Sequence, residues 1–214
     1  MKYWIFSILT ALIAYGAGSL STMVLASNFV FHTNLRRLGR GGAWLSAFRR
    51  VYGAKGFVKL ALIEFLKDAL PVIIGGWLFS SGGNADVGRA LAAFCLVLGR
   101  MYPSVYGFRG SYATAALGVG MMFVSFSVGA AVLLVSILVS WATRYIALGT
   151  LAGAVVLAVA GVLVLDNALA VRLCFFIAIL TLIRMLPALA RIASKKEPRL
   201  NFEKDISYKF DEKI

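Results

Sequence analysis

Long runs of apolar residues, each near the length of a membrane-crossing helix, limit most strongly what this chain can fold into. Four of them cover residues 4–30, 57–79, 145–165 and 168–186. A helix that crosses the hydrocarbon core of a bilayer needs about 20 such residues. Hydrophobic residues make up 61% of the 214 positions and charged residues 14%, whereas soluble domains average about 45–50% and about 25%. We therefore interpret the chain as a membrane protein and exclude a soluble or disordered one.

The spans are predicted to be helices, because an open sheet would leave backbone groups unpaired in lipid. A membrane barrel would instead show strands of about ten residues with alternating polarity. We expect an all-α, polytopic bundle of about seven transmembrane helices. Residues 1–194 are predicted to form one membrane domain and residues 195–214 a polar cytoplasmic tail.

The number of helices depends on the nearly uncharged stretch 113–142. As one straight helix this stretch would reach about 45 Å at 1.5 Å per residue, against a hydrocarbon core of about 30 Å. It is therefore either one strongly tilted helix or two short helices that break near Ser125 to Ser127. Two helices give seven passes, whereas one helix would put Arg109 and Arg144 on opposite sides of the membrane. The charge pattern favours seven.

The positive charge of the chain predicts its orientation. The net charge is +13, and no acidic residue lies between Arg36 and Lys59, where basic residues are dense. Lys and Arg concentrate in the cytoplasmic loops of membrane proteins, which explains this balance without a nucleic acid partner. We predict the amino end outside and the carboxyl end in the cytoplasm, with the basic face available to anionic lipids or substrates.

Neither a metal site nor a disulfide scaffold is expected. The chain has two cysteines, Cys95 and Cys174, and both lie inside apolar runs, while His32 is the single histidine. We interpret the cysteines as small packing residues and the histidine as a residue of the membrane interface.

Charged residues inside the second apolar run have two interpretations. Lys59, Glu64, Lys67 and Asp68 lie within ten residues, and charges within a span are costly unless they face protein or water. Glu64 and Asp68 are four apart and therefore share a helical face, with Lys67 three residues from Glu64. These residues either form a buried ion pair that fixes helix packing or lie near a substrate.

Arginines and glycines gather on the predicted cytoplasmic face. The guanidinium fork matches the geometry of phosphate oxygens, and glycine lets backbone N–H groups approach an anion. This pattern indicates a ligand that carries phosphate, although cytoplasmic topology alone also places arginines in these loops. The residues concerned are Arg36, Arg37, Arg40, Arg49, Arg50, Arg100, Arg109, Arg144, Gly39, Gly41, Gly42, Gly107 and Gly110.

Several short motifs resemble those of one family. Residues 18–22 (GSLST) are similar to G-S-I-P-T, residues 67–71 (KDALP) to K-G-A-L-P, and residues 143–150 (TRYIALGT) to T-R-Y-V-S-L-G-S, with 197–199 (EPR) at the place of a closing T-E-x-K. In this order they resemble the bacterial membrane acyltransferases that make lysophosphatidic acid from acyl-phosphate and glycerol 3-phosphate, the PlsY family. The resemblance implies a seven-helix fold in the bacterial inner membrane, with acyl-phosphate, glycerol 3-phosphate and membrane lipids as partners and no cofactor.

The functional motifs of that family are changed here. Residues 39–50 align with G-S-G-N-x-G-A-T-N-x-x-R, where Arg40 replaces the serine, Ser46 stands for the threonine and Arg50 is kept. Arg100 replaces the histidine of the second motif, and the glycine loop that follows is shorter by two residues. The polar H-R-x-N of the last helix becomes the apolar stretch 185–188.

The resemblance implies an anion-binding pocket at the cytoplasmic face, with no residue that stands out as a general base. Because the lost side chains are donors that would position the hydroxyl and stabilise an oxyanion, a non-catalytic relative that binds phosphate-bearing lipid precursors, or modulates a lipid enzyme, is the alternative. A small transporter is a third possibility. The predicted pocket residues are Ser46, Arg50, Arg100, Arg109, Gly110, Ser111 and Arg144, with Glu197 orienting one of these arginines.

Overall fold

The computed structural model describes residues 2–22, 26, 42–108, 110–197 and 199–200, with only the course of the backbone for 2–3, 42–51 and 106. Within these residues the chain forms seven α-helices and one 3₁₀ turn (Ser104–Tyr106), with no strand, which confirms the all-α prediction. The helices are α1 (Lys2–Ser19), α3 (Gly42–Ser80), α4 (Ala85–Met101), α5 (Thr114–Met122), α6 (Phe126–Thr143), α7 (Ile146–Val164) and α8 (Ala168–Ala193).

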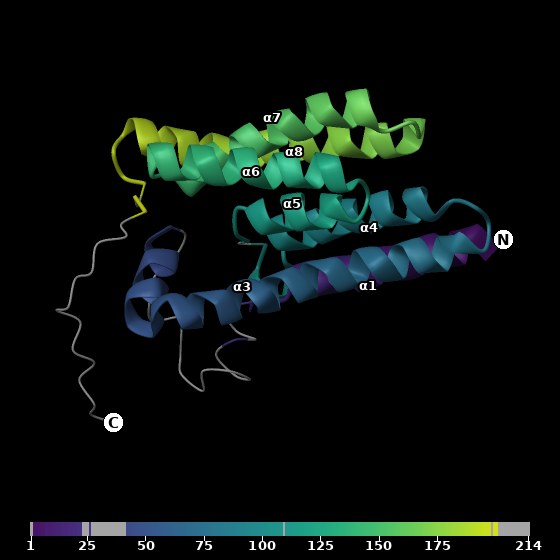
Figure 1. Cartoon of the computed structure of the whole chain (residues 1–214), viewed down its shortest axis with the longest axis horizontal. Coiled ribbons are helices and arrows are strands. Elements are labelled where there is room, and N and C mark those ends of the chain that lie inside the picture. Colours follow the sequence, from purple (N-terminus) through teal and green to yellow (C-terminus); the bar gives the residue numbers. More distant parts are fainter. Residues whose placement is uncertain (1, 23–25, 27–41, 109, 198, 201–214) are drawn as a thin grey trace.

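The helices pack lengthwise into one bundle (Figure 1). Helices α1, α3 and α4 pack together on one side, helices α6, α7 and α8 on the other, and the short α5 lies between the two groups. Among the described helices, α6, α7 and α8 are long and apolar enough to cross a membrane. Large apolar side chains point outward, among them Trp141 and Leu163 at 70% and 77% exposure, as a lipid-facing surface requires.

The bundle has two distinct ends. At one end the start of α1 meets the end of α3, where the Phe6 and Phe79 rings lie 6.5 Å apart. Asp86, Ser125 and Asp166 line a common hollow there. The opposite end carries the loop between α4 and α5, the turn between α6 and α7, and residues 194–197 and 199–200 (Figure 1). The described chain therefore begins and finishes at opposite ends.

The break predicted near Ser125 is confirmed. Helix α5 ends at Met122 and α6 begins at Phe126, and Ser125 between them has an extended backbone. The two helices run in opposite directions (Figure 1), so the loop before α5 and Arg144 after α6 share one end of the bundle. With nine residues, α5 is about 14 Å long and reaches only part of the way across.

Two boundaries predicted from the sequence are wrong. The first helix was expected to continue to residue 30, but α1 ends at Ser19; residues 27–41, with His32, lie outside the described part. Residues 33–56 were expected to be a loop, whereas α3 begins at Gly42 and is broken at Gly53, whose φ is 66°. Apolar residues at 44, 47, 48 and 51 have the spacing of an amphipathic helix, and the basic residues among them concealed it.

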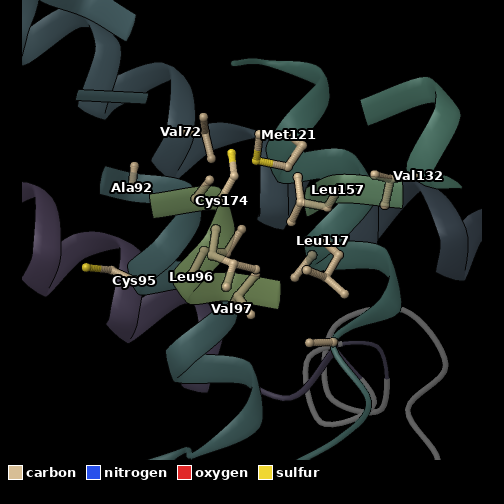
Figure 2. Close-up of a cluster of buried hydrophobic side chains, with 14 of the residues drawn as sticks. Val72, Ala92, Cys95, Leu96, Val97, Leu117, Met121, Val132, Leu157 and Cys174 are labelled. Carbon is tan, nitrogen blue, oxygen red and sulfur yellow. The ribbon is translucent and has the colours of Figure 1, made fainter. Parts of the chain in front are cut away.

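The core lies where α4, α5, α7 and α8 meet (Figure 2). Leu96, Leu117 and Leu157 are 0% exposed and come from three of these helices. Cys174 of α8 packs in the same cluster and Cys95 at its edge, and neither forms a disulfide. This confirms their predicted role as packing residues.

Helices α1 and α4 approach each other closely through two glycines. A Cβ on Gly18 would lie 2.2 Å from the carbonyl oxygen of Leu96, and one on Gly99 would lie 2.3 Å from that of Tyr15. Small residues allow this contact between membrane helices. The contact fixes the end of α4, where Arg100 follows Gly99.

Candidate functional site

A charged cluster is buried between α3 and α4. Arg100 Nη2 forms ion pairs with Glu64 and with Asp68, the latter at 3.4 Å. Arg100 Nη1 donates to Thr22 Oγ1 at 3.4 Å, and Lys67 Nζ lies 2.8 Å from Asp68 Oδ1. Two basic and two acidic side chains therefore balance each other, which a buried charge requires in order to be tolerated.

This cluster confirms the interpretation of the second-span charges as a buried ion pair that fixes helix packing. Glu64 and Asp68 share a face, as predicted, and both contact Arg100. The partner was missed because Arg100 is 32 residues beyond Asp68 in sequence. Arg100 was assigned to the anion pocket, and the structure places its side chain among carboxylates.

The loop between α4 and α5 folds back onto the end of α4. Ser111 N donates to the carbonyl oxygen of Arg100 at 3.2 Å, and a Cβ on Gly110 would lie 2.1 Å from the same oxygen. From α8, Arg184 Nη2 donates to the Gly110 carbonyl oxygen at 3.2 Å. The structure thus brings Arg100, Gly110 and Ser111, three of the predicted pocket residues, into direct contact.

Glu197 connects the end of α8 with the loop before α5. It is 7% exposed, its Oε2 lies 2.7 Å from Arg191 Nε, and its Oε1 accepts from the Tyr112 hydroxyl. Burial raises the pKa of Tyr112, and the hydrogen bond to Glu197 raises it further. Among the described residues Glu197 pairs with Arg191, because α8 continues past residue 186 and presents this arginine.

Arg144 lies at the same end of the bundle. It closes α6 with a left-handed backbone (φ 61°), its side chain is exposed, and its carbonyl oxygen accepts from Leu200 N at 2.8 Å. Arg199 Nε donates to the Tyr145 hydroxyl at 2.9 Å, with the guanidinium 5.5 Å from the ring centre. Residues 199–200 therefore lie against the start of α7.

Three predicted pocket residues fall beyond this description: Arg109 lies outside the described residues, as do the side chains of Ser46 and Arg50. Among the described residues no three His, Cys, Asp or Glu side chains are grouped to hold a metal ion. Sequence reasoning missed Arg184 and Arg191. An arginine within the apolar run 168–186 was the available signal for Arg184, since a charge within a span is a candidate functional residue.

Comparison with known proteins gives one consistent result. The family model described as glycerol-3-phosphate acyltransferase matches residues 8–195. The glycerol-3-phosphate acyltransferase of Thermoanaerobacter sp. (strain X514) is 29% identical over 150 residues, which is 70% of this chain and 73% of the relative. That of Syntrophotalea carbinolica is 29% identical over 189 residues, which is 88% of this chain and 94% of the relative.

The fold is also similar to that of a solved structure. The glycerol 3-phosphate form of PlsY (YgiH), an integral membrane glycerol 3-phosphate acyltransferase, superposes with a TM-score of 0.70. The match covers 91% of this chain and 96% of that chain at 24% identity. At this identity the likeness establishes the helical membrane fold.

Proposed function

The chain belongs to the glycerol-3-phosphate acyltransferase family, and from this we propose that it transfers an acyl chain from acyl-phosphate to glycerol 3-phosphate, giving lysophosphatidic acid. It is a multi-pass helical membrane protein. The family match over residues 8–195 carries the proposal, because it extends from the first helix to the end of the last one. We place the protein in the bacterial inner membrane, with residues 1–194 as the membrane domain and residues 195–214 as a cytoplasmic tail.

The proposed site lies at the end of the bundle that holds the loop between α4 and α5. Support comes from the contact of Gly110 and Ser111 with the end of α4. It also comes from Arg144, which closes α6 in the turn before α7; this turn lies at the same end of the bundle (Figure 1). Glycine with backbone N–H groups, next to cationic side chains, suits a phosphate ligand. The proposed binding residues are Ser46, Arg50, Arg109, Gly110, Ser111 and Arg144, with Arg100 and Glu197 as positioning residues, since both are paired with side chains of opposite charge.

The proposed reaction needs little covalent chemistry from the protein. The glycerol 3-phosphate hydroxyl oxygen forms a bond to the acyl carbon, and the bond from that carbon to the phosphate oxygen breaks. The leaving phosphate takes the electron pair, and the hydroxyl proton passes to a phosphate oxygen. Positive side chains then act by stabilising the leaving phosphate and by holding the two substrates together.

Complementation tests the proposal. The gene is expressed in a bacterium depleted of its own acyl-phosphate-dependent acyltransferase, with membrane insertion verified by immunoblot. Growth is the expected result, together with formation of lysophosphatidic acid by purified protein from acyl-phosphate and labelled glycerol 3-phosphate. If the protein is stable and inserted but supports neither growth nor product formation, the proposed acyltransferase activity is wrong.

The alternative is a non-catalytic relative that binds phosphate-bearing lipid precursors. The replaced motif residues favour it, since removing one oxyanion donor typically costs about 10²–10³ in rate. Binding of glycerol 3-phosphate without turnover, lost in the Arg50→Ala variant, would establish it. The identity of the acyl donor is tested in the acyl-transfer assay with purified protein, where acyl-phosphate is replaced by the acyl thioester of coenzyme A. We expect product with acyl-phosphate and none with the thioester.

A further inference from the structure

Arg184 is a charged residue within a membrane-spanning helix that the proposed site does not use. It lies in α8, nine residues before the end of that helix at Ala193, which is about 14 Å along the axis. Its surroundings along the helix are apolar. An arginine at such a depth normally faces the protein interior and marks a binding or transport path.

The side chain of Arg184 is held in place from two sides. Its Nη2 donates to the Gly110 carbonyl oxygen at 3.2 Å, and its Cζ lies 5.7 Å from the centre of the Tyr102 ring. Tyr102 is itself fixed, because the Tyr15 hydroxyl of α1 donates to its carbonyl oxygen at 2.7 Å. The guanidinium is therefore positioned beside the Gly110 loop before any ligand arrives.

The charge of Arg184 is not compensated within the described part of the chain. Its Nε is buried without a hydrogen-bond partner there, and no described carboxylate forms an ion pair with it. Arg100 and Arg191, at the same end of the bundle, are each paired with carboxylates. A buried N–H without a partner is costly, and a half-buried charge without a counter-ion is also unfavourable, so an anion at this position removes both costs.

We propose that Arg184 binds a phosphate group of a substrate beside Gly110. The inference rests on the proposed function for the identity of the ligand, since both substrates of that reaction carry phosphate. The guanidinium offers Nε and a terminal nitrogen as parallel donors to two phosphate oxygens. The Gly110 carbonyl oxygen accepts from one of the two N–H groups of Nη2, and the Tyr102 ring lies against the face of the guanidinium.

The test compares three variants of the full-length protein in detergent. Arg184→Gln removes the charge, Arg184→Lys keeps the charge without the fork, and Arg172→Gln is the matched control, an exposed arginine near the other end of the same helix. KM is measured separately for glycerol 3-phosphate and for acyl-phosphate, with inorganic phosphate as a competing inhibitor. The substrate whose KM changes identifies the bound phosphate.

Arg184→Gln is expected to raise one KM at least tenfold and to weaken inhibition by phosphate by a similar factor, with a smaller change in kcat. Arg184→Lys should fall in between, and Arg172→Gln should match the unmodified protein. Unchanged KM values and unchanged inhibition in a folded Arg184→Gln protein would overturn the inference. Should that variant not fold, the comparison of Arg184→Lys with Arg172→Gln decides in the same way.

A second measurement separates this inference from the proposed function. Stabilisation by inorganic phosphate is followed by thermal unfolding, which needs no turnover. If the protein catalyses no transfer but phosphate stabilises it and does not stabilise Arg184→Gln, the proposed reaction fails and the anion site stands. If phosphate stabilises both equally, or neither, the assignment of Arg184 is wrong.

Discussion

Pairing with carboxylates divides the arginines at the loop-bearing end of the bundle into two kinds. The guanidinium of Arg100 lies against Glu64 and Asp68, and that of Arg191 lies against Glu197. Their positive charge is largely cancelled locally. A ligand anion is therefore attracted mainly by arginines without such a partner, so that charge count alone overstates how many residues bind it.

The first prediction concerns the ion pairs of Arg100. Arg100→Gln leaves the carboxylate of Asp68, which is 0% exposed, without its arginine partner. Breaking a buried pair by removing one partner costs about 3–5 kcal/mol, so the variant should unfold at markedly lower temperature or denaturant concentration. Combining it with Asp68→Asn should cost less than the sum of the two single changes.

The matched control for this cycle is the ion pair of Arg89 with Asp86. Its atoms lie 3.1 Å apart, but the side chains are 41% and 66% exposed. Exposed pairs contribute at most about 1 kcal/mol, so Arg89→Gln should change stability little. Additive effects at Arg100 and Asp68, or equal losses in Arg89→Gln and Arg100→Gln, would contradict a structural role for the buried cluster.

Residue types and spacing predicted part of this site from the sequence. The shared face of Glu64 and Asp68 follows from helical periodicity, and the role of Gly110 follows from its type. Their contact with Arg100 depends on how α3 and α4 cross, and no local pattern encodes that crossing. Arg191 was missed for a related reason, since the end of α8 was placed too early in the chain.

At the scale of elements, the loop between α4 and α5 depends on a single small residue. The Cβ of Gly110→Ala would lie 2.1 Å from the Arg100 carbonyl oxygen and 2.5 Å from that of Met101. The loop must shift away from α4, which breaks the hydrogen bond from Ser111. We predict at least a tenfold loss of kcat/KM for glycerol 3-phosphate, measured by the acyl-transfer assay.

Gly16→Ala is the control for this substitution. It lies inside α1, and a Cβ there meets no atom within 4 Å. Alanine is favoured over glycine inside helices by about 1 kcal/mol, so this variant should retain full activity and equal or higher stability. An unchanged kcat/KM in Gly110→Ala would show that the loop tolerates displacement and is not part of the site.

The segment after α8, which we call the strap, connects the end of α8 with the loop before α5 and with the end of α6. Glu197 and Leu200 are buried, and Leu200 N donates to the Arg144 carbonyl oxygen. We predict that a cysteine at Leu200 reacts slowly with a maleimide, and that adding Glu197→Ala speeds its labelling several-fold because the contacts to Arg191 and Tyr112 are lost. A cysteine at the exposed Ser194 gives the reference rate, and equal slow rates with and without Glu197 would refute the strap.

Element boundaries were predictable where composition changes sharply. The turn before α4, the break at Ser125 and the end of α6 at Thr143 all coincide with polar residues in apolar surroundings. The start of α3 was not predictable in this way. Arginines occupy the polar face of this amphipathic helix, and in sequence such a segment resembles a basic loop. Helix α8 continues through Pro187 to Ala193. The apolar run 168–186 was therefore shorter than the helix itself.

At the scale of the whole molecule, the arrangement of α5 and α6 determines which groups meet. Because these two helices reverse direction within the bundle, the Gly110 loop, Arg144 and the strap gather at one end, and Asp86 and Asp166 lie at the other. The fold thereby brings described segments that are far apart in the sequence to one end of the bundle.

The side of the membrane that this basic end faces is the last prediction. Lys and Arg are retained in the cytoplasm, so the turn at Ser81 should face outside and Ser194 should face inside. Both residues are exposed, and the native Cys95 and Cys174 are buried, which keeps background labelling low. In intact cells a membrane-impermeant maleimide should label a cysteine at Ser81 but label one at Ser194 only after permeabilisation. The reverse pattern would place the proposed site outside the cell, away from cytoplasmic acyl-phosphate, and would overturn the assigned orientation together with the substrate assignment.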